Sequence, residues 1–232
     1  MKMYRYETHL HTKEASACGI STGAEMARAH KAAGYDGIFI TDHFFNGNCG
    51  IAKNLSWKER VEQFCSGFEN AKEEGDKIGL KVFFGFEYGA NNAEFLVYNL
   101  DKCFLLRHPD IHLLPTREAI AIMRKEGGFL IQPHPFRERY YVDHIELYPH
   151  DVDGVEAING AQLDKPEMNE RAEIYARMYD LPVTSGSDTH DVNKMFGCGV
   201  ASDIPFQTPL DYLKQLKAGT LALLSANEER SS

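Results

Sequence analysis

The sequence lacks the features that usually mark secreted, membrane and nucleic-acid-binding proteins. Its five cysteines are scattered, with no C-x-x-C pair, so they do not indicate a disulfide framework. No apolar run approaches the roughly 18 residues of a membrane span, and the first residues lack the apolar core of a signal peptide. The net charge of −9 argues against binding long nucleic acid or anionic membranes by bulk electrostatics. We therefore expect a cytoplasmic protein that acts on a small molecule and has no membrane partner.

The chain also lacks internal repeats and any obvious linker, which favours a single domain over residues 1–232. With 43% hydrophobic residues it can bury a substantial core. Strand-like and helix-like segments alternate, which is typical of parallel α/β folds and predicts seven or eight βα units. The strands are expected at 4–8, 37–41, 81–86, 95–100, 129–131, 155–158, 181–184 and 220–224. The helices are expected at 22–33, 57–71, 116–126, 166–179 and 208–218.

Histidines and carboxylates gather where the predicted strands end. Because side chains alternate along a strand, His9 and His11 are expected on one face, where two neutral imidazoles can chelate a metal. The carboxyl ends of parallel strands meet at one edge of the fold, so the other candidates are expected beside them. The full set is His9, His11, His43, Glu87, His134, Asp188 and His190. This clustering predicts a metalloenzyme, whereas His30, in the middle of a predicted helix, is interpreted as structural.

The donor types restrict the choice of metal. Imidazoles mixed with carboxylates suit Zn²⁺, Mn²⁺ or Fe²⁺ better than Ca²⁺ or Mg²⁺, which prefer oxygen ligands. Seven donors are too many for one ion, so we expect two or three divalent transition-metal ions. Glu87 is the natural bridge between neighbouring ions.

Five motifs follow one another along the chain: His9-Leu10-His11, Ile40-Thr41-Asp42-His43, Gly85-Phe86-Glu87, His134-Pro135 and Gly186-Ser187-Asp188-Thr189-His190. In this order they resemble the polymerase and histidinol phosphatase (PHP) superfamily of metal-dependent phosphoesterases. The resemblance covers most of the chain. It implies a distorted, TIM-like (β/α)₇ barrel with its metal site at the C-terminal ends of the strands.

The resemblance also implies how the ions are shared. One ion would be held by His9, His11, Glu87 and Asp188, a second by Glu87 and His134, and a third by His43 and His190. Asp42 would orient a neighbouring ligand. The catalytic residues would be Glu87, Asp188 and His190.

The chain departs from the PHP pattern at two positions. Many members carry an aspartate or histidine before the glycine that follows the H-x-H loop, where this chain has Cys18. Cys18 is either a thiolate ligand of the third ion or a plain small hydrophobe. Many members also have a histidine at the start of the strand after the glutamate, and here Glu94, His108 or His112 would have to complete the second site.

The sequence offers no serine or cysteine nucleophile with a paired base. The predicted reaction is therefore hydrolysis of a small phosphate ester, either a phosphomonoester or a short nucleotide, by a metal-bound hydroxide. His190 or His43 would protonate the leaving oxygen. Arg137 is the candidate phosphate clamp because its planar guanidinium matches phosphate oxygens, with Arg139 as the alternative.

Three other functions remain open. An exonuclease or oligonucleotide phosphodiesterase would use the same metals on a different ester. An amidohydrolase-like enzyme also begins with H-x-H, but it usually bridges its metals with a lysine where this chain has Glu87. A barrel that keeps its metals only for structure is the third, although structural zinc sites are mostly rich in cysteine. The loops 44–54 and 137–153 are expected to shape the pocket.

Overall fold

The computed structural model describes residues 2–90, 92–140 and 142–225. Nine strands form one sheet in the order β7-β6-β5-β4-β3-β2-β1-β8-β9. The strands are β1 (Tyr4–Leu10), β2 (Gly37–Ile40), β3 (Lys81–Ala90), β4 (Ala93–Tyr98), β5 (Phe129–Gln132), β6 (Gly154–Asn159), β7 (Val183–Gly186), β8 (Gly199–Ser202) and β9 (Ala222–Leu224). The helices are α1 (Gly23–Ala32), α2 (Trp57–Ile78), α3 (Lys102–Arg107), α4 (Thr116–Lys125), α5 (Pro166–Met178) and α6 (Pro209–Ala218). None of the described helices is long and apolar enough to cross a membrane.

The sheet curls into a barrel that closes at the carboxyl end of β1. Beyond β7 the chain runs beside β1, where the backbone N–H of Asp188 donates to the His9 carbonyl at 2.8 Å and that of His11 donates to the Thr189 carbonyl at 2.9 Å. At its other end β1 pairs with the antiparallel β8. The predicted distorted, TIM-like barrel is thus confirmed.

The regular succession of βα units that the sequence predicts is wrong in one half of the barrel. β3 and β4 form an antiparallel hairpin, in which Glu87 pairs with Leu96, so Glu87 lies inside a strand that continues to Ala90. The described residues between β5 and β6 form no helix. The short strand β8 and the helix α3 were also not predicted. The hairpin replaces one helical crossover, because antiparallel neighbours need only a short connection.

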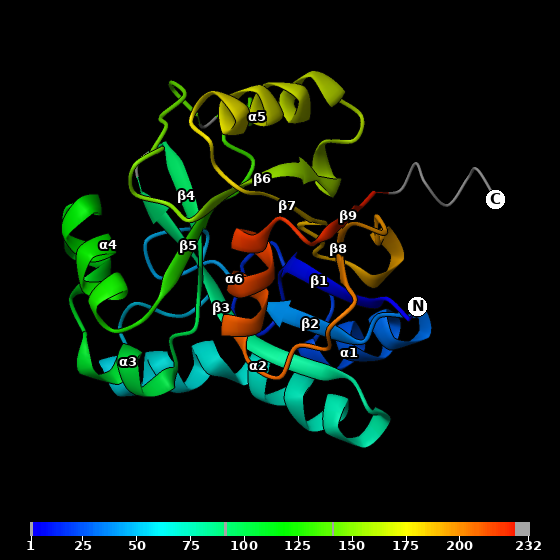
Figure 1. Cartoon of the computed structure of the whole chain (residues 1–232). Coiled ribbons are helices and arrows are strands. Elements are labelled where there is room, and N and C mark those ends of the chain that lie inside the picture. Colours follow the sequence, from blue (N-terminus) through cyan, green and yellow to red (C-terminus); the bar gives the residue numbers. More distant parts are fainter. Residues whose placement is uncertain (1, 91, 141, 226–232) are drawn as a thin grey trace.

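An aromatic cluster fills the amino-terminal end of the barrel. It includes Tyr6, Phe39 and Tyr98 from three strands and Tyr212 from α6, and all four side chains are buried. The helix α6 lies across this end of the barrel (Figure 1). Because apolar groups occupy this end, the polar side chains of the strands collect at the other end.

A bulge in β1 allows one strand to serve both ends of the barrel. The pairing of β1 with β2 shifts register between Glu7 and Leu10. Strict alternation would place Tyr6 and His9 on opposite faces. With the shift, Tyr6 packs in the aromatic cluster while His9 and His11 both face the polar end.

The helices α1 and α2 pack closely against each other (Figure 1). Both begin with a capping box, formed by Thr22 with Glu25 and by Ser56 with Glu59. Gly67 lies where α2 meets the loop after β1. A methyl group there would meet the Thr12 Oγ1 atom at 2.1 Å.

We predict that Gly67→Ala lowers the free energy of unfolding by about 1–3 kcal/mol through overpacking. The intrinsic helix preference of alanine over glycine acts in the opposite direction, by ~1 kcal/mol. Chemical denaturation measures the difference, with Gln63→Ala on the exposed side of α2 as the matched control. A Gly67→Ala protein as stable as the control would contradict the close contact.

Candidate metal centre

All seven side chains predicted as ligands meet at the polar end of the barrel. His9 and His11 come from β1, and their Nε2 atoms lie 3.1 Å apart. Glu87 comes from β3, and the other four follow the ends of β2, β5 and β7. Six of the seven residues are buried, while the side chain of His190 is 25% exposed.

The ligand atoms fall into four overlapping groups, and within each group they lie within 4.8 Å of one another. The groups are His9 with His11 and Glu87; His9 with His134 and Asp188; His11 with His43 and His190; and His43 with Glu87 and Glu94. Their overlap is the arrangement expected of neighbouring ions that share ligands.

Three buried atoms of this cluster have no hydrogen-bond partner. They are Nδ1 of His43, Oε2 of Glu87 and Oδ1 of Asp188. The first two lie only 2.6 Å apart, yet they form no hydrogen bond of good geometry. A buried polar atom without a partner is costly unless something else satisfies it. Cations bound within the groups that contain these residues would satisfy them, so the donor set fits divalent metal ions.

Neighbouring charges set the protonation of the carboxylates. Burial by itself would raise the pKa of Glu87, but the imidazoles of His43 and His9 hold it well below its usual range. Burial acts in the same direction on Asp188, and the guanidinium of Arg137 holds the pKa of this group well below its usual range. Both carboxylates are therefore ionised, as metal ligands must be.

Hydrogen bonds fix the orientation of the two rings from β1. Nδ1 of His11 lies 3.3 Å from the Ser16 hydroxyl, which donates to Asp42 at 2.6 Å. Asp42 also accepts from the backbone of Thr12, so it anchors the loop that carries Ser16. Asp42 thus lies one hydroxyl group away from the His11 ring, where the sequence predicts an orienting residue.

The sequence analysis missed Glu156. This fully buried residue of β6 lies with its Oε1 atom 3.0 Å from Nδ1 of His9, and its other oxygen accepts from Asn159 at 2.7 Å. An Nδ1–H that donates to Glu156 leaves Nε2 of His9 free to face the cluster. The available signal was a carboxylate in the middle of the apolar run Val155-Glu156-Ala157-Ile158.

Cys18 lies at the edge of the cluster, where its thiol contacts both His43 and His190. Burial would raise the pKa of this thiol, but hydrogen bonds with the two imidazoles lower it to about 6. Its neighbours are therefore candidate ligands rather than apolar side chains.

Of the three candidates left open for the second site, only Glu94 is in place. Its Oε2 atom lies 3.7 Å from Nε2 of His134, and its Oε1 atom lies 4.0 Å from Nδ1 of His43. His112 instead stacks on Trp57, and His108 lies 3.7 Å from Glu126. Both histidines are partly buried.

Arg137 reaches the cluster through its contact with Asp188. Its guanidinium donates to the Asp188 carboxylate and lies 3.4 Å from the side-chain oxygen of Asn159. Arg137 also lines the adjoining cavity, whereas Arg139 is not among the described residues that line it.

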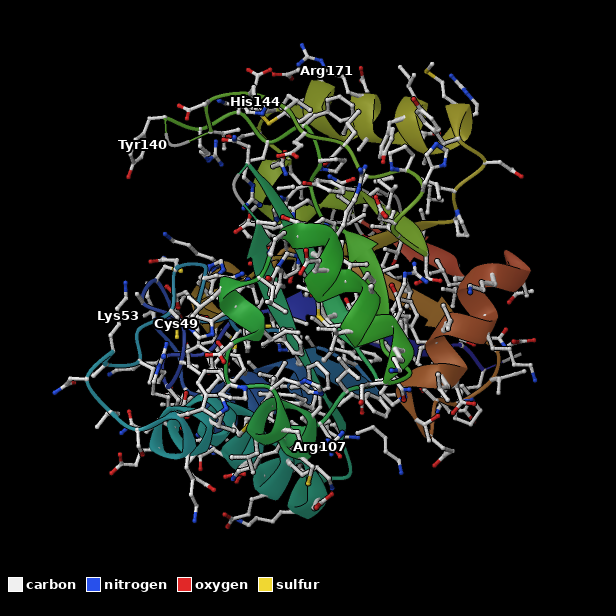
Figure 2. All side chains as sticks on the ribbon, turned by 90° about the vertical axis from the view of Figure 1, so that its left-hand side faces the viewer. Cys49, Lys53, Arg107, Tyr140, His144 and Arg171 are labelled. Carbon is white, nitrogen blue, oxygen red and sulfur yellow. The ribbon has the colours of Figure 1, made fainter. Side chains whose placement is uncertain are left out.

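A cavity of about 600 Å³ opens beside the cluster. His43, Glu94, His134 and His190 form part of its wall, and residues of the segments 46–48, 132–140 and 142–145 contribute much of the rest. Figure 2 shows Cys49 and Lys53, from the loop after β2, on the same side of the molecule as Tyr140 and His144, from the segment between β5 and β6. A cavity of this size suits a small ligand.

We predict that Glu156→Gln weakens metal binding or activity by about 10–100-fold, because His9 loses the negative partner that holds its ring. Metal affinity, measured by competition with a coloured chelator, tests this together with the rate. Glu170→Gln, on the exposed face of α5, is the control. Unchanged affinity and rate in Glu156→Gln would show that this contact has no influence on His9.

Comparisons with known proteins agree with this description. Residues 166–221 match the family described as PHP-associated. The comparison with curated proteins gave no match. Among solved structures, a two-domain protein from Bacteroides vulgatus, containing a predicted PHP-like metal-dependent phosphoesterase, is similar with a TM-score of 0.71 and 18% identity. The similarity covers 96% of this chain but only 64% of that protein.

Two further structures share the fold. An amidohydrolase from Chromobacterium violaceum has a TM-score of 0.59 and 13% identity, over 96% of this chain and 98% of that one. A lesion-specific endonuclease from Pyrococcus furiosus has a TM-score of 0.61 and 12% identity, over 96% of this chain and 58% of that one. The comparisons thus show a shared barrel fold, together with a PHP-associated segment at residues 166–221.

Proposed function

We propose that this protein is a metal-dependent hydrolase that cleaves a small phosphate ester. The observation that carries the proposal is the buried cluster of imidazoles and carboxylates, with three unpartnered atoms, beside a cavity of about 600 Å³. The similar protein from Bacteroides vulgatus contains a predicted metal-dependent phosphoesterase, which supports this reaction class.

The cluster would hold two or three divalent ions through the residues predicted for this role. His9, His11, Glu87 and Asp188 form one set, and Glu87 with His134 begins a second. His43 and His190 form the third, with Cys18 beside them. The chemistry that such ions supply is activation of water near neutral pH and neutralisation of phosphate oxygens.

The other residues have roles that follow from their positions. His190 lines the cavity, and its Nδ1 lies 2.9 Å from the backbone carbonyl of Asp188. An Nδ1–H that donates to this carbonyl fixes the ring and leaves only Nε2 for chemistry. Nε2 would bind the third ion or, in a centre with two ions, would protonate the leaving oxygen. Arg137 is the cationic side chain, outside the histidines, that the described wall of the cavity presents to a phosphate group.

A small substrate fits this cavity better than a nucleic acid strand. The net charge of −9 gives no general attraction for a polyanion. A mononucleotide or a sugar phosphate needs only the local charge of the cluster and Arg137. The similar endonuclease and amidohydrolase make phosphodiester and C–N hydrolysis the alternatives to be tested.

A metal-reconstituted activity screen tests the proposal. The panel contains sugar phosphates, nucleotides, histidinol phosphate, short oligonucleotides and amides. We expect turnover of at least one small phosphate ester, abolished by a chelator and restored by metal. Turnover of amides alone, or of oligonucleotides alone, would establish the corresponding alternative. Bound metal with no turnover over the whole panel would favour a structural role.

We predict that Glu87→Gln keeps the fold but lowers the rate by about 10²–10³, because the bridging charge is lost while the side-chain volume is kept. Steady-state kinetics, thermal unfolding and metal content are measured on the same preparation. Glu118→Gln, on the exposed side of α4, is the control. A rate near that of the unaltered protein, with full metal content, would exclude this role for Glu87.

We predict that Arg137→Lys weakens both turnover and inhibition by inorganic phosphate by roughly 1–3 kcal/mol, the scale of a hydrogen bond to a charged group. Lysine keeps the positive charge but cannot bind phosphate through two parallel N–H groups. The inhibition constant of phosphate is the decisive measurement, with Arg139→Lys as the control. Unaltered phosphate inhibition in Arg137→Lys would mean that Arg137 serves only its contact with Asp188.

A further inference from the structure

A buried amide lies between the metal cluster and the arginine that the proposed function assigns to phosphate binding. Asn159 is the last residue of β6, and it is fully buried. Its Nδ2 atom donates to the Glu156 carboxylate at 2.7 Å, and its Oδ1 atom accepts from a terminal nitrogen of Arg137 at 3.4 Å. Asn159 therefore joins the carboxylate that contacts His9 to a guanidinium that lines the cavity.

The backbone of Asn159 is fixed independently of these contacts. Its N–H donates to Oδ1 of Asn169 at 3.2 Å, and its carbonyl accepts from Nδ2 of the same side chain at 3.3 Å. The next residue, Gly160, packs so closely that a Cβ atom there would lie 2.9 Å from Cα of Ser187. The fold therefore sets the place of the Asn159 amide, and Arg137 comes to it from a loop.

The charges around Asn159 determine which way its amide faces. The amino end points to carboxylates, because Nδ2 lies 3.5 Å from Oδ2 of Asp188 as well as 2.7 Å from Glu156. The carbonyl end faces the guanidinium of Arg137. An amide offers donors at one end and an acceptor at the other without a net charge, whereas an ionised carboxylate offers acceptors alone. Asparagine can therefore contact both kinds of charge without adding a further one.

Arg137 is only partly satisfied by its protein partners. One terminal nitrogen donates to both Asp188 and Asn159, but the Nε atom is buried without a hydrogen-bond partner. The side chain is 12% exposed, and it lines the cavity. A buried donor without a partner is costly unless an acceptor satisfies it. The two contacts thus hold the guanidinium while an N–H group remains for an acceptor on a ligand.

Holding a long side chain in its binding orientation increases affinity, because less conformational freedom is lost when the ligand binds. Of the two partners of Arg137, Asp188 is also a candidate metal ligand, whereas Asn159 belongs to none of the groups of possible ligands. Resting on the phosphate site of the proposed function, we propose that Asn159 is a positioning residue for phosphate recognition. It holds the Arg137 guanidinium in the orientation that binds the phosphate group.

Binding of inorganic phosphate to the metal-loaded protein, measured by calorimetry, tests the proposal without any turnover. Asn159→Ser removes both amide contacts and leaves room for water beside Glu156. We expect the Kd of phosphate to rise about 10-fold, the scale of a lost hydrogen bond to a charged group, with the metal content unchanged. Asn70→Ser is the matched control, because Nδ2 of Asn70 also donates to a glutamate, Glu14 at 3.0 Å, but on the exposed side of α2.

A double-mutant cycle separates positioning from a purely structural role. In an Arg137→Ala background there is no guanidinium to position, so Asn159→Ser should change the Kd of phosphate by less than about 2-fold. A residue that only stabilised the fold would have the same effect in both backgrounds. Asn159→Leu, which nearly keeps the size of the side chain, repeats the comparison. Thermal unfolding and metal analysis of every variant show whether the fold and the metal centre are retained.

Four outcomes would overturn the positioning role. They are an unchanged Kd of phosphate in Asn159→Ser, an equal rise in both Arg137 backgrounds, a loss of bound metal together with phosphate, and failure of both Asn159 variants to fold.

Ester hydrolysis, measured on the same samples, separates this proposal from the proposed function. Phosphate binding that follows the expected pattern, without turnover of any ester, would refute only the proposed hydrolysis. Ester turnover with an unchanged Kd of phosphate in Asn159→Ser would refute only the positioning role. An unaltered protein that binds metal but no phosphate would refute both.

Discussion

The site depends on how the barrel is joined at β1. The buried carboxylate of Glu7 accepts the backbone N–H groups of His9 and Ser187, each at 2.9 Å, and also the Ser187 hydroxyl. It thereby ties the strand that carries two candidate ligands to the segment that carries two more. Gly186 allows this approach, because a Cβ atom there would lie 2.4 Å from Oε1 of Glu156. The carboxylate of Glu7 and the absence of a side chain at Gly186 thus bring together candidate ligands that lie far apart in the sequence.

The backbone is strained at two of the candidate ligands. His134 has a φ of 30° and Asp188 a φ of 55°, in a region that side chains other than glycine rarely adopt. Such conformations cost about 1–3 kcal/mol each, and they persist where the surroundings enforce them. The N–H of Asp188 is held by the His9 carbonyl at 2.8 Å, and the His134 carbonyl accepts from Arg137 at 2.9 Å. The fold therefore supports an unfavourable local geometry at the points where these side chains enter the cluster.

Six of the seven candidate ligands could be predicted to meet because they lie at or just after the carboxyl ends of strands, a rule that needs no three-dimensional information, whereas Glu87 lies inside β3. Parallel strands bring their carboxyl ends together, so a histidine after a buried apolar run already has an expected place. Glu94 and Glu156 do not obey this rule. Glu94 reaches the cluster only because β4 runs antiparallel to β3, and a single sequence does not show that pairing. Glu156 sits within a strand, where its neighbour His9 is fixed by closure of the barrel. The contact of Arg137 with Asp188 depends on the path of a loop, which local residue patterns do not determine.

The aromatic cluster beside α6 determines from which side a substrate can enter and a product can leave. The amino-terminal end of the barrel is filled by Tyr6, Phe39, Tyr98 and Tyr212. The candidate metal centre is therefore reached from the cavity at the other end, which is lined by residues of the segments 46–48, 132–140 and 142–145. A substrate and its products would therefore share the opening formed by these described residues. Two products that leave a cavity through the same opening would be released one after the other, and the slower release would delay binding of the next substrate. The product that is bound more tightly at the metal centre would be released last. The residues that bind the anion would therefore also set the rate of product release.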